Sequence, residues 1–316
     1  MSCSTLFLPM CASLLATQVT ASIPVEPETE AIIADALPDQ FLQPDAEQIA
    51  IDQDRLERMT VSITIENEGP YDFIIDTAAQ RTILSKEIAG ALALDIEDEV
   101  NIVALAGTTI VQTVYVPSLT LGKRSYESLI APTFRSKNIG ADGVLGLDSL
   151  QGQRILFDFV GKNIAVEDTS EKKRSRSRRE IVVTARRRSG QLIFTNATIA
   201  GIKTNVIIDT GGELSIGNKI LQRRLRLKSS AMTQINLVDI TGQATEADYG
   251  IAEELHIGRA RFGVIPIAFS DIAPFKALKL DKKPALFLGM DALRKFDRVA
   301  IDFANRKIYF LLPKDS

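Results

Sequence analysis

The sequence predicts an all-β fold made of two similar, mainly β lobes with few short helices. Two observations lead to this prediction: a set of landmarks that occurs twice in the same order, and segments typical of β-strands in both halves of the chain. With 316 residues, the chain is long enough for two compact domains, each with its own core.

The duplication is visible as four matched landmarks. The first is an apolar strand that ends in Asp-Thr, at 73–77 and again at 206–210. The others are a strand closing on glycine (119–122 and 255–258), a hydrophobic-hydrophobic-glycine segment (144–148 and 287–291) and a segment with Asp-Phe at its end (155–159 and 299–303). Matched landmarks are separated by 133, 136, 143 and 144 residues. A repeat this long indicates two lobes rather than a solenoid of short repeats.

Segments that alternate or are rich in β-branched residues predict strands in each half. They are Met59–Ile65, Val100–Leu105, Thr109–Val116, Gln191–Ile199, Thr233–Ile240 and Ala260–Phe269. Three short segments are the helix candidates: Ser85–Leu94, Asn218–Leu225 and Asp291–Phe296. Ala106-Gly107 and Thr241-Gly242, each about 30 residues after an Asp-Thr pair, are predicted at hairpin tips.

Composition excludes several kinds of chemistry. The net charge of −3 predicts no nucleic-acid partner, and after the first residues no segment approaches the roughly 20 apolar residues of a transmembrane helix. The chain has two cysteines, Cys3 and Cys11, both near the N-terminus, and one histidine, His256. We therefore expect no disulfide, no metal site and no thiol nucleophile in the body of the protein.

The order of segments predicts five parts: a signal peptide (1–21), an acidic segment (22–55), an N-terminal lobe (56–169), a basic linker (170–190) and a C-terminal lobe (191–316). The apolar run Leu6–Ala16 and the small residues before a cut after Ala21 are typical of an export signal. The absence of Lys and Arg before this run leaves a disordered N-terminus or a misplaced start codon as alternatives. We expect 22–55 to be disordered or a pro-segment, and the protein to be periplasmic or secreted.

The two Asp-Thr pairs carry the predicted chemistry. Asp76 and Asp209 each follow an apolar run and precede small residues, and a carboxylate there is costly unless it is functional or fully hydrogen-bonded. Pseudo-twofold symmetry would bring the two loops face to face, and two adjacent carboxylates share a proton. One can then accept a proton from water while the other donates to a carbonyl oxygen.

These motifs resemble the aspartic peptidases of the retropepsin and pepsin type. The Asp-Thr-Ala of residues 76–78 and the Asp-Thr-Gly of 209–211 look like the family's first signature, and Val144-Leu145-Gly146 and Phe287-Leu288-Gly289 look like its second. The resemblance covers about residues 56–312. No flap tyrosine or disulfide set of animal and fungal pepsins is evident, so the retropepsin pattern, here as two retropepsin-like β-barrel lobes in one chain, fits better.

The resemblance implies a role for each matched residue. Asp76 and Asp209 would be the catalytic pair of an endopeptidase acting on proteins or peptides without a cofactor or metal. Thr77 and Thr210 would cross-link the two loops through hydroxyl-to-backbone hydrogen bonds, and Ala78 and Gly211 would direct backbone N–H groups at the carboxylates. The hairpin tips would lie over the cleft as flaps, with Gly107, Thr108, Thr241 and Gly242 as the candidates. Ala78 departs from the usual glycine, and a catalytically silent peptide-binding or scaffold protein on the same fold is the alternative.

The linker contains two different stretches. Residues 172–179 carry six basic residues and are predicted to be a flexible connector. The β-prone stretch Glu180–Ala185 that follows resembles the TonB box of outer-membrane receptors, which binds its partner by adding an extended strand. Two interpretations stay open for it: an ordinary strand between the lobes, or a recruitment site for a TonB-like partner.

Overall fold

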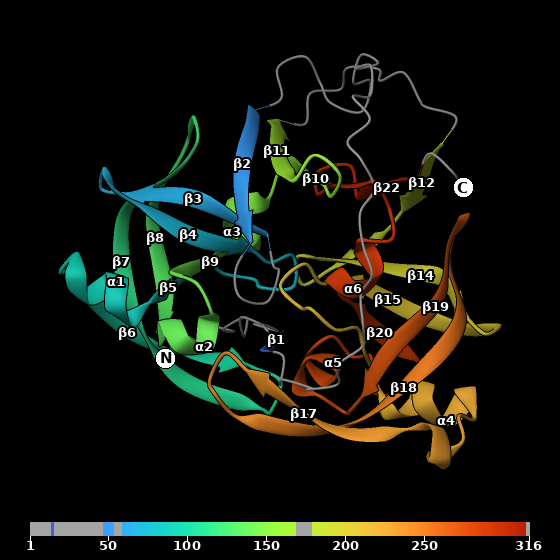
Figure 1. Cartoon of the computed structure of the whole chain (residues 1–316). Helices are drawn as coiled ribbons and strands as arrows, with labels where there is room; N and C mark the ends of the chain where they lie inside the picture. The colour runs from blue at the N-terminus through green and yellow to red at the C-terminus, as the bar shows by residue number, and fades with distance from the viewer. Residues whose placement is uncertain (1–13, 16–46, 54–58, 169–178, 314–316) are drawn as a thin grey trace, which may run out of the picture.

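The computed structural model describes residues 14–15, 47–53, 59–168 and 179–313. The fold is 56% strand and 14% helix, so it is mainly β as the sequence predicts. Figure 1 shows the N-terminal lobe, in blue and green, beside the C-terminal lobe, in yellow to red. Among the described residues no helix has the length and apolar character needed to cross a bilayer.

The N-terminal lobe is built from seven strands and three short helices. They are β3 (Met59–Ile65), β4 (Glu68–Ile75), β5 (Ile83–Ser85), α1 (Lys86–Ala91), β6 (Ile96–Val103), β7 (Thr108–Leu121), β8 (Arg124–Phe134), α2 (Ser136–Ile139), β9 (Gly143–Leu145) and α3 (Leu147–Leu150). The pairing order is β3-β4-β9-β5-β8-β7-β6, and a further pairing of β3 with β7 closes the sheet on itself.

The C-terminal lobe repeats this arrangement strand for strand. Its elements are β14 (Gln191–Ile199), β15 (Ile202–Ile208), β16 (Ile216–Gly217), α4 (Lys219–Leu225), η1 (Ser229–Ala231), β17 (Thr233–Asp239), β18 (Ala244–Ile257), β19 (Ala260–Phe269), α5 (Ala273–Ala277), β20 (Ala285–Leu288) and α6 (Met290–Leu293). The order β14-β15-β20-β16-β19-β18-β17, with β14 also paired to β18, matches that of the first lobe. The duplication read from the sequence is therefore a duplication of topology.

Matched helices also begin in the same way. The Ser85 hydroxyl accepts a hydrogen bond from the Ile88 N–H at 3.1 Å and so caps α1. Asn218, 133 positions later, caps α4 by accepting from the Leu221 N–H at 2.9 Å. Both side chains satisfy an N–H group that the first turn of a helix leaves without a partner.

A central sheet joins the lobes. It runs β12 (Glu180–Thr184), β22 (Lys307–Leu311), β21 (Arg298–Asp302), β10 (Gln153–Asp158), β11 (Asn163–Asp168) and β2 (Glu47–Gln53), and continues into β3. β10 of the first half pairs antiparallel with β21 of the second, with Ile155 opposite Ile301. Because backbone hydrogen bonds and one apolar cluster cross this junction, the lobes are held at a fixed orientation.

Strands also occur in the three segments that lie outside the two predicted lobes, and β12 agrees with the interpretation of 180–185 as a strand between the lobes. Glu47–Gln53, in the acidic segment, forms β2 between β11 and β3; the rest of that segment lies outside the described residues. In the linker, β12 pairs along its whole length with β22, and β13 (Arg186–Arg188) pairs with β14, while 170–178 lies outside the description. Leu14–Leu15, in the predicted signal peptide, forms β1 beside β17. The pairings of β1 with β17, of β2 with β11 and of β12 with β22 join segments distant in sequence, so local periodicity gives no sign of them.

Candidate active site

Asp76 and Asp209 lie at equivalent places in the two lobes, directly after β4 and β15. Each of these strands pairs in parallel with the strand of the hydrophobic-hydrophobic-glycine segment, β9 or β20. The Asp76 N–H donates to the Leu145 carbonyl at 3.1 Å, and the Asp209 N–H donates to the Leu288 carbonyl at 2.9 Å. Both aspartates are buried, with 0% and 1% of their surface exposed.

Backbone N–H groups from the following small residues hold each carboxylate. Oδ1 of Asp76 accepts from Ala78 at 2.7 Å and from Ala79 at 3.1 Å. Oδ1 of Asp209 accepts from Gly211 at 3.2 Å and from Gly212 at 3.0 Å. Alanine at 78 therefore keeps the hydrogen bond that the usual glycine would make.

The two loops face each other at van der Waals distance. A Cβ atom added to Gly211 would lie only 2.3 Å from Cγ of Asp76 and 2.5 Å from its Oδ2. The carboxylate of one lobe thus rests against the backbone of the other lobe's loop. The φ of Gly211 is not in the left-handed region. The glycine is therefore required for the close approach of the two loops and not for an unusual backbone conformation.

The electrostatics at Asp209 favour a protonated carboxyl. Burial raises its pKa well above the usual range, and the charge of Asp76 raises it further, while the Gly212 and Gly211 N–H groups offset part of this rise. Its Oδ2 is buried and accepts no hydrogen bond from the residues that the structure describes. A buried carboxylate oxygen without a donor is costly when ionised, so a proton on this pair lowers its free energy.

The two threonines cross-link the loops. Thr77 Oγ1 donates to the Ile208 carbonyl at 2.9 Å and accepts from the Thr210 N–H at 3.3 Å. Thr210 Oγ1 donates to the Ile75 carbonyl at 2.7 Å and accepts from the Thr77 N–H at 3.1 Å. These reciprocal bonds are the hydroxyl-to-backbone contacts expected from the sequence, and they limit relative movement of the two carboxylates.

A glycine and a carboxylate support each loop from below. A Cβ on Gly146 would come within 2.3 Å of the Arg81 backbone, and one on Gly289 within 2.7 Å of the Leu214 backbone, which explains the glycine in both signatures. Asp148 accepts from the Thr82 hydroxyl and Asp291 from the Ser215 hydroxyl, each at 2.8 Å. Burial raises the pKa of Asp148, and it raises that of Asp291 to about 6.

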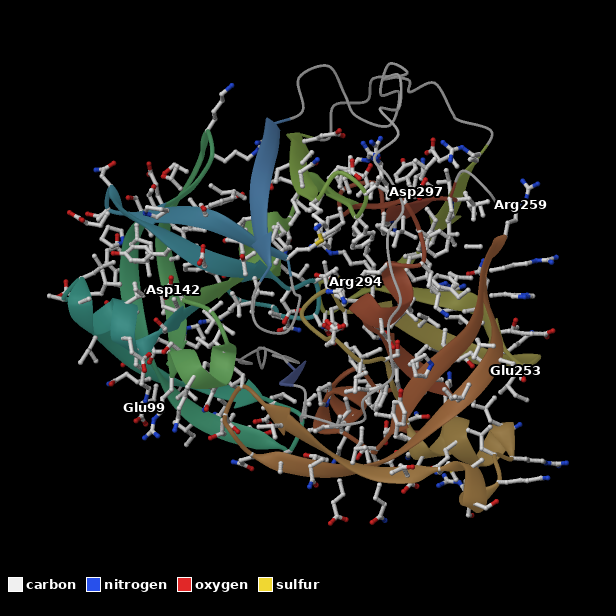
Figure 2. The ribbon with its side chains drawn as sticks, in the orientation of Figure 1. Glu99, Asp142, Glu253, Arg259, Arg294 and Asp297 are labelled. Carbon is white, nitrogen blue, oxygen red and sulfur yellow. The ribbon has the colours of Figure 1, made fainter. Side chains whose placement is uncertain are left out.

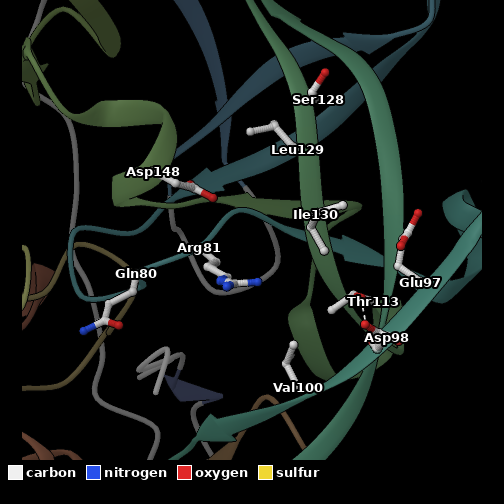
Figure 3. A pocket seen from close by; sticks show the side chains of 10 residues that line it. All are labelled: Gln80, Arg81, Glu97, Asp98, Val100, Thr113, Ser128, Leu129, Ile130 and Asp148. Atoms are coloured by element: carbon white, nitrogen blue, oxygen red, sulfur yellow. Dashed lines mark hydrogen bonds between the residues drawn. The ribbon is translucent and has the colours of Figure 1, made fainter. Parts of the chain in front are cut away.

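The flanks of the pair differ between the lobes. On the C-terminal side Glu213 forms an ion pair with Arg294 at 2.6 Å, close to the centre of the molecule in Figure 2. On the N-terminal side Arg81 reaches into a pocket of about 560 Å³ that is also lined by Asp98, Thr113 and Ile130 (Figure 3). Leu214 occupies the position equivalent to Arg81, so the two sides of the pair offer different chemistry to a bound chain.

The four flap candidates lie on the β6–β7 and β17–β18 hairpins. Gly107 and Thr108 are at the tip of the first hairpin and Thr241 and Gly242 at the tip of the second. The tips meet, because the Ala106 N–H donates to Oδ2 of Asp239 at 3.2 Å. The catalytic role of the pair and the flap role of the hairpins stay predictions.

Sequence reasoning missed two residues here, Asp239 and Gln191. The Gln191 side chain is buried at the start of β14 and donates to the Ala78 carbonyl at 2.7 Å. It thus braces the N-terminal loop from the C-terminal lobe. No local sequence pattern distinguishes Gln191. Asp239 lies two residues before Thr241, and polar residues are common near hairpin tips, so its position alone predicts no role.

Comparison with known families agrees with this geometry. Residues 61–152 match the model described as gag-polyprotein putative aspartyl protease, and residues 195–292 match the model described as aspartyl protease. A search of curated proteins found no match. One match falls on each lobe, and each spans one Asp-Thr loop with its supporting glycine. This chain belongs to the retropepsin-like aspartic peptidase family, with two protease domains in tandem.

Proposed function

We propose that the protein is an exported aspartic endopeptidase, acting in the periplasm or outside the cell, with Asp76 and Asp209 as its catalytic pair. The observation that carries the proposal is the pair of buried carboxylates on loops cross-linked by Thr77 and Thr210. Like charges held this close share one proton. The raised pKa of Asp209 supports placing that proton on Asp209.

The reaction uses both forms of the carboxyl group. Asp76 takes a proton from a water molecule as the water oxygen bonds to the peptide carbonyl carbon, and Asp209 gives its proton to the carbonyl oxygen. In the second step Asp76 gives its proton to the amide nitrogen as the C–N bond breaks, while a hydroxyl of the tetrahedral intermediate returns a proton to Asp209. The products are a carboxylic acid and an amine, and the pair again holds one proton.

Single substitutions of the pair test the proposal. Asp76→Asn and Asp209→Asn each keep the size and one acceptor oxygen of the side chain, but an amide cannot exchange the proton. We expect each variant to lose at least about 10³-fold in kcat on a fluorogenic peptide library while its thermal unfolding stays near that of the wild type. Cleavage at the wild-type rate by either variant would refute the assignment; binding of peptides without cleavage by the wild type would favour the silent peptide-binding alternative.

Export and partner recruitment are further parts of the proposal. The N-terminal apolar run supports export, and sequencing the N-terminus of the protein from a periplasmic fraction tests it: a start at Ser22 is expected, and an intact Met1 would exclude it. β12 is the terminal strand of the central sheet, so strand addition by a TonB-like partner has an edge available. Pull-down of TonB by the wild type, but not by a variant with Val182→Pro, tests that part.

A further inference from the structure

The tips of the two hairpins each reach into the opposite lobe. Leu105, at the tip of the N-terminal hairpin, is 1% exposed and lies in an apolar cluster with Ile207, Ile216 and Phe287 of the C-terminal lobe. Ile240, at the tip of the other hairpin, is fully buried in a cluster of the N-terminal lobe. The exchange is reciprocal.

The surfaces that receive the tips flank the aspartates. Ile240 packs in the cluster of Ile74, Ile83 and Val144, which are the N-terminal equivalents of the residues around Leu105. Ile74 and Ile207 each lie two residues before a catalytic-pair aspartate. We expect a peptide extended across the pair to place its side chains on these same apolar surfaces, in which case the tips and the substrate compete for them.

Asp239 holds this arrangement in place. Its carboxylate is fully buried and accepts four hydrogen bonds. Three come to Oδ1 from its own hairpin: the Thr241 N–H at 2.9 Å, the Thr241 hydroxyl at 2.5 Å and the Gln243 N–H at 3.2 Å. The fourth comes to Oδ2 from the Ala106 N–H of the opposite hairpin, at 3.2 Å. One carboxylate thus orders one tip and binds the other.

The contact has no counterpart on the other side. Matching Gly107 with Gly242 aligns Asp239 with Ala104, which has no side-chain acceptor. The Ala104 N–H instead bonds within its own turn, to the Gly107 carbonyl at 2.8 Å. The C-terminal hairpin also packs against α2 of the N-terminal lobe. The Asn138 side chain of α2 lies 3.0 Å from the position that a Cβ atom on Gly242 would take.

We propose that Asp239 is a latch: in the resting protein it keeps the two hairpins together, with each tip packed on the apolar surface of the opposite lobe. Substrate then binds only after the bond between Asp239 and the Ala106 N–H opens. The inference rests on the proposed function, for which Asp239 is a positioning residue that touches no reacting atom. Closure over the pair is consistent with the burial of Asp76 and Asp209. An occupied resting state lowers apparent affinity by the fraction of open molecules.

The variant Asp239→Asn isolates the latch bond. The amide oxygen can keep the three bonds within the hairpin, whereas the amide nitrogen, a donor, then faces the Ala106 N–H. Thr241→Val is the matched control, because it removes one donor to Oδ1 and leaves the bond between hairpins intact. Nitroxide labels on Thr108→Cys and Gln243→Cys, both exposed tip positions, report the hairpin separation in the full chain with Cys3 and Cys11 replaced by serine.

We expect a single short distance in the wild type and in Thr241→Val. In Asp239→Asn a longer population should grow, with the open-to-closed ratio increased about ten-fold or more, since bonds to charged acceptors are among the strong ones. A distribution unchanged by Asp239→Asn would overturn the latch. If that variant fails to fold, exchange in the wild type decides: the exposed Ala106 amide should exchange more slowly than that of Gly107, and equal rates would refute the bond.

Kinetics give a second readout. If the latch competes with substrate, Asp239→Asn should lower KM several-fold with little change in kcat. A raised KM would contradict self-occupation. Inactive wild-type protein would refute the proposed peptidase but not the latch, because the label distances need no catalysis.

Discussion

Gly211 offers the sharpest test of how the two loops are packed. Gly211→Ala would place a methyl group 2.3 Å from Cγ of Asp76, where real Cβ atoms do not come closer than 3.0 Å. No backbone strain is involved, since no left-handed φ is recorded at this position. The whole effect is therefore steric, and either the carboxylate or the loop must move by about 1 Å.

The size of the effect follows from this shift. Misplacing a catalytic group by about 1 Å can cost about 100-fold in rate, or about 2.7 kcal/mol in the barrier. Added volume in a packed interior also costs about 1 to 3 kcal/mol of stability. Measuring kcat/KM on a peptide substrate together with urea unfolding separates the two effects.

The reverse substitution on the other lobe is the matched control. Ala78→Gly removes a methyl group and retains the N–H that bonds Asp76, so we expect activity within about three-fold of the wild type and a stability loss of about 1 kcal/mol. The reasoning is refuted if Gly211→Ala keeps full kcat/KM, or if the two variants lose activity equally.

Three further predictions follow from the same geometry. Thr77→Ala and Thr210→Ala each leave two buried backbone groups without partners. We therefore expect the free energy of unfolding to fall by about 2 to 4 kcal/mol and the activity to fall with it. Serine at either position should stay near wild type, and equal behaviour of the Ala and Ser variants would contradict the cross-link. Because the pKa of Asp291 is raised from 3.8 to about 6 in the folded state, the native protein binds more protons than the unfolded chain in this range. The free energy of unfolding should therefore fall as the pH rises from about 4 to about 6, by up to about 3 kcal/mol. Asp291→Asn should flatten this fall in urea titrations, and an unchanged slope would exclude Asp291 as its source. Replacing Ile181, Val182 and Val183 with Ser should lower stability by about 3 kcal/mol or more, since Val183 is buried in the core that joins the lobes; Thr184→Ser is the control, and unchanged melting would favour a role in partner binding instead.

Much of the fold was predictable because it follows from short-range pattern and duplication. Apolar strands ending in Asp-Thr, and glycines in matched positions, are local features that occur once in each half of the sequence. Strands β3, β14 and β19 have the predicted bounds, since alternation and β-branching set them. The helix candidates at 85–94 and 291–296 coincide in place with α1 and α6 but extend further along the chain. α1 ends early because Ala93 takes a left-handed φ of 49° and the Leu94 N–H bonds to the Ala89 carbonyl at 3.0 Å.

Other parts depend on contacts between segments far apart in the chain. β2 and β12 pair with β11 and β22, each more than 100 positions away in the chain. The brace from Gln191 to Ala78 and the bond from Ala106 to Asp239 likewise join residues more than 100 positions apart. Polar residues like these show no periodicity, and their partners are chosen by the docking of one lobe on the other.

The sequence by itself thus determined the two lobes, the aspartates and the residues beside them, since each is a local motif that occurs twice. Only the tertiary structure decided what the differences between the two copies do. Gly211 presses on Asp76, Arg81 and Leu214 flank the pair unequally, and one hairpin carries a carboxylate where the other has an alanine. The physical reason is that symmetry in a single chain is only approximate, so each lobe evolves its own contacts at the interface between them.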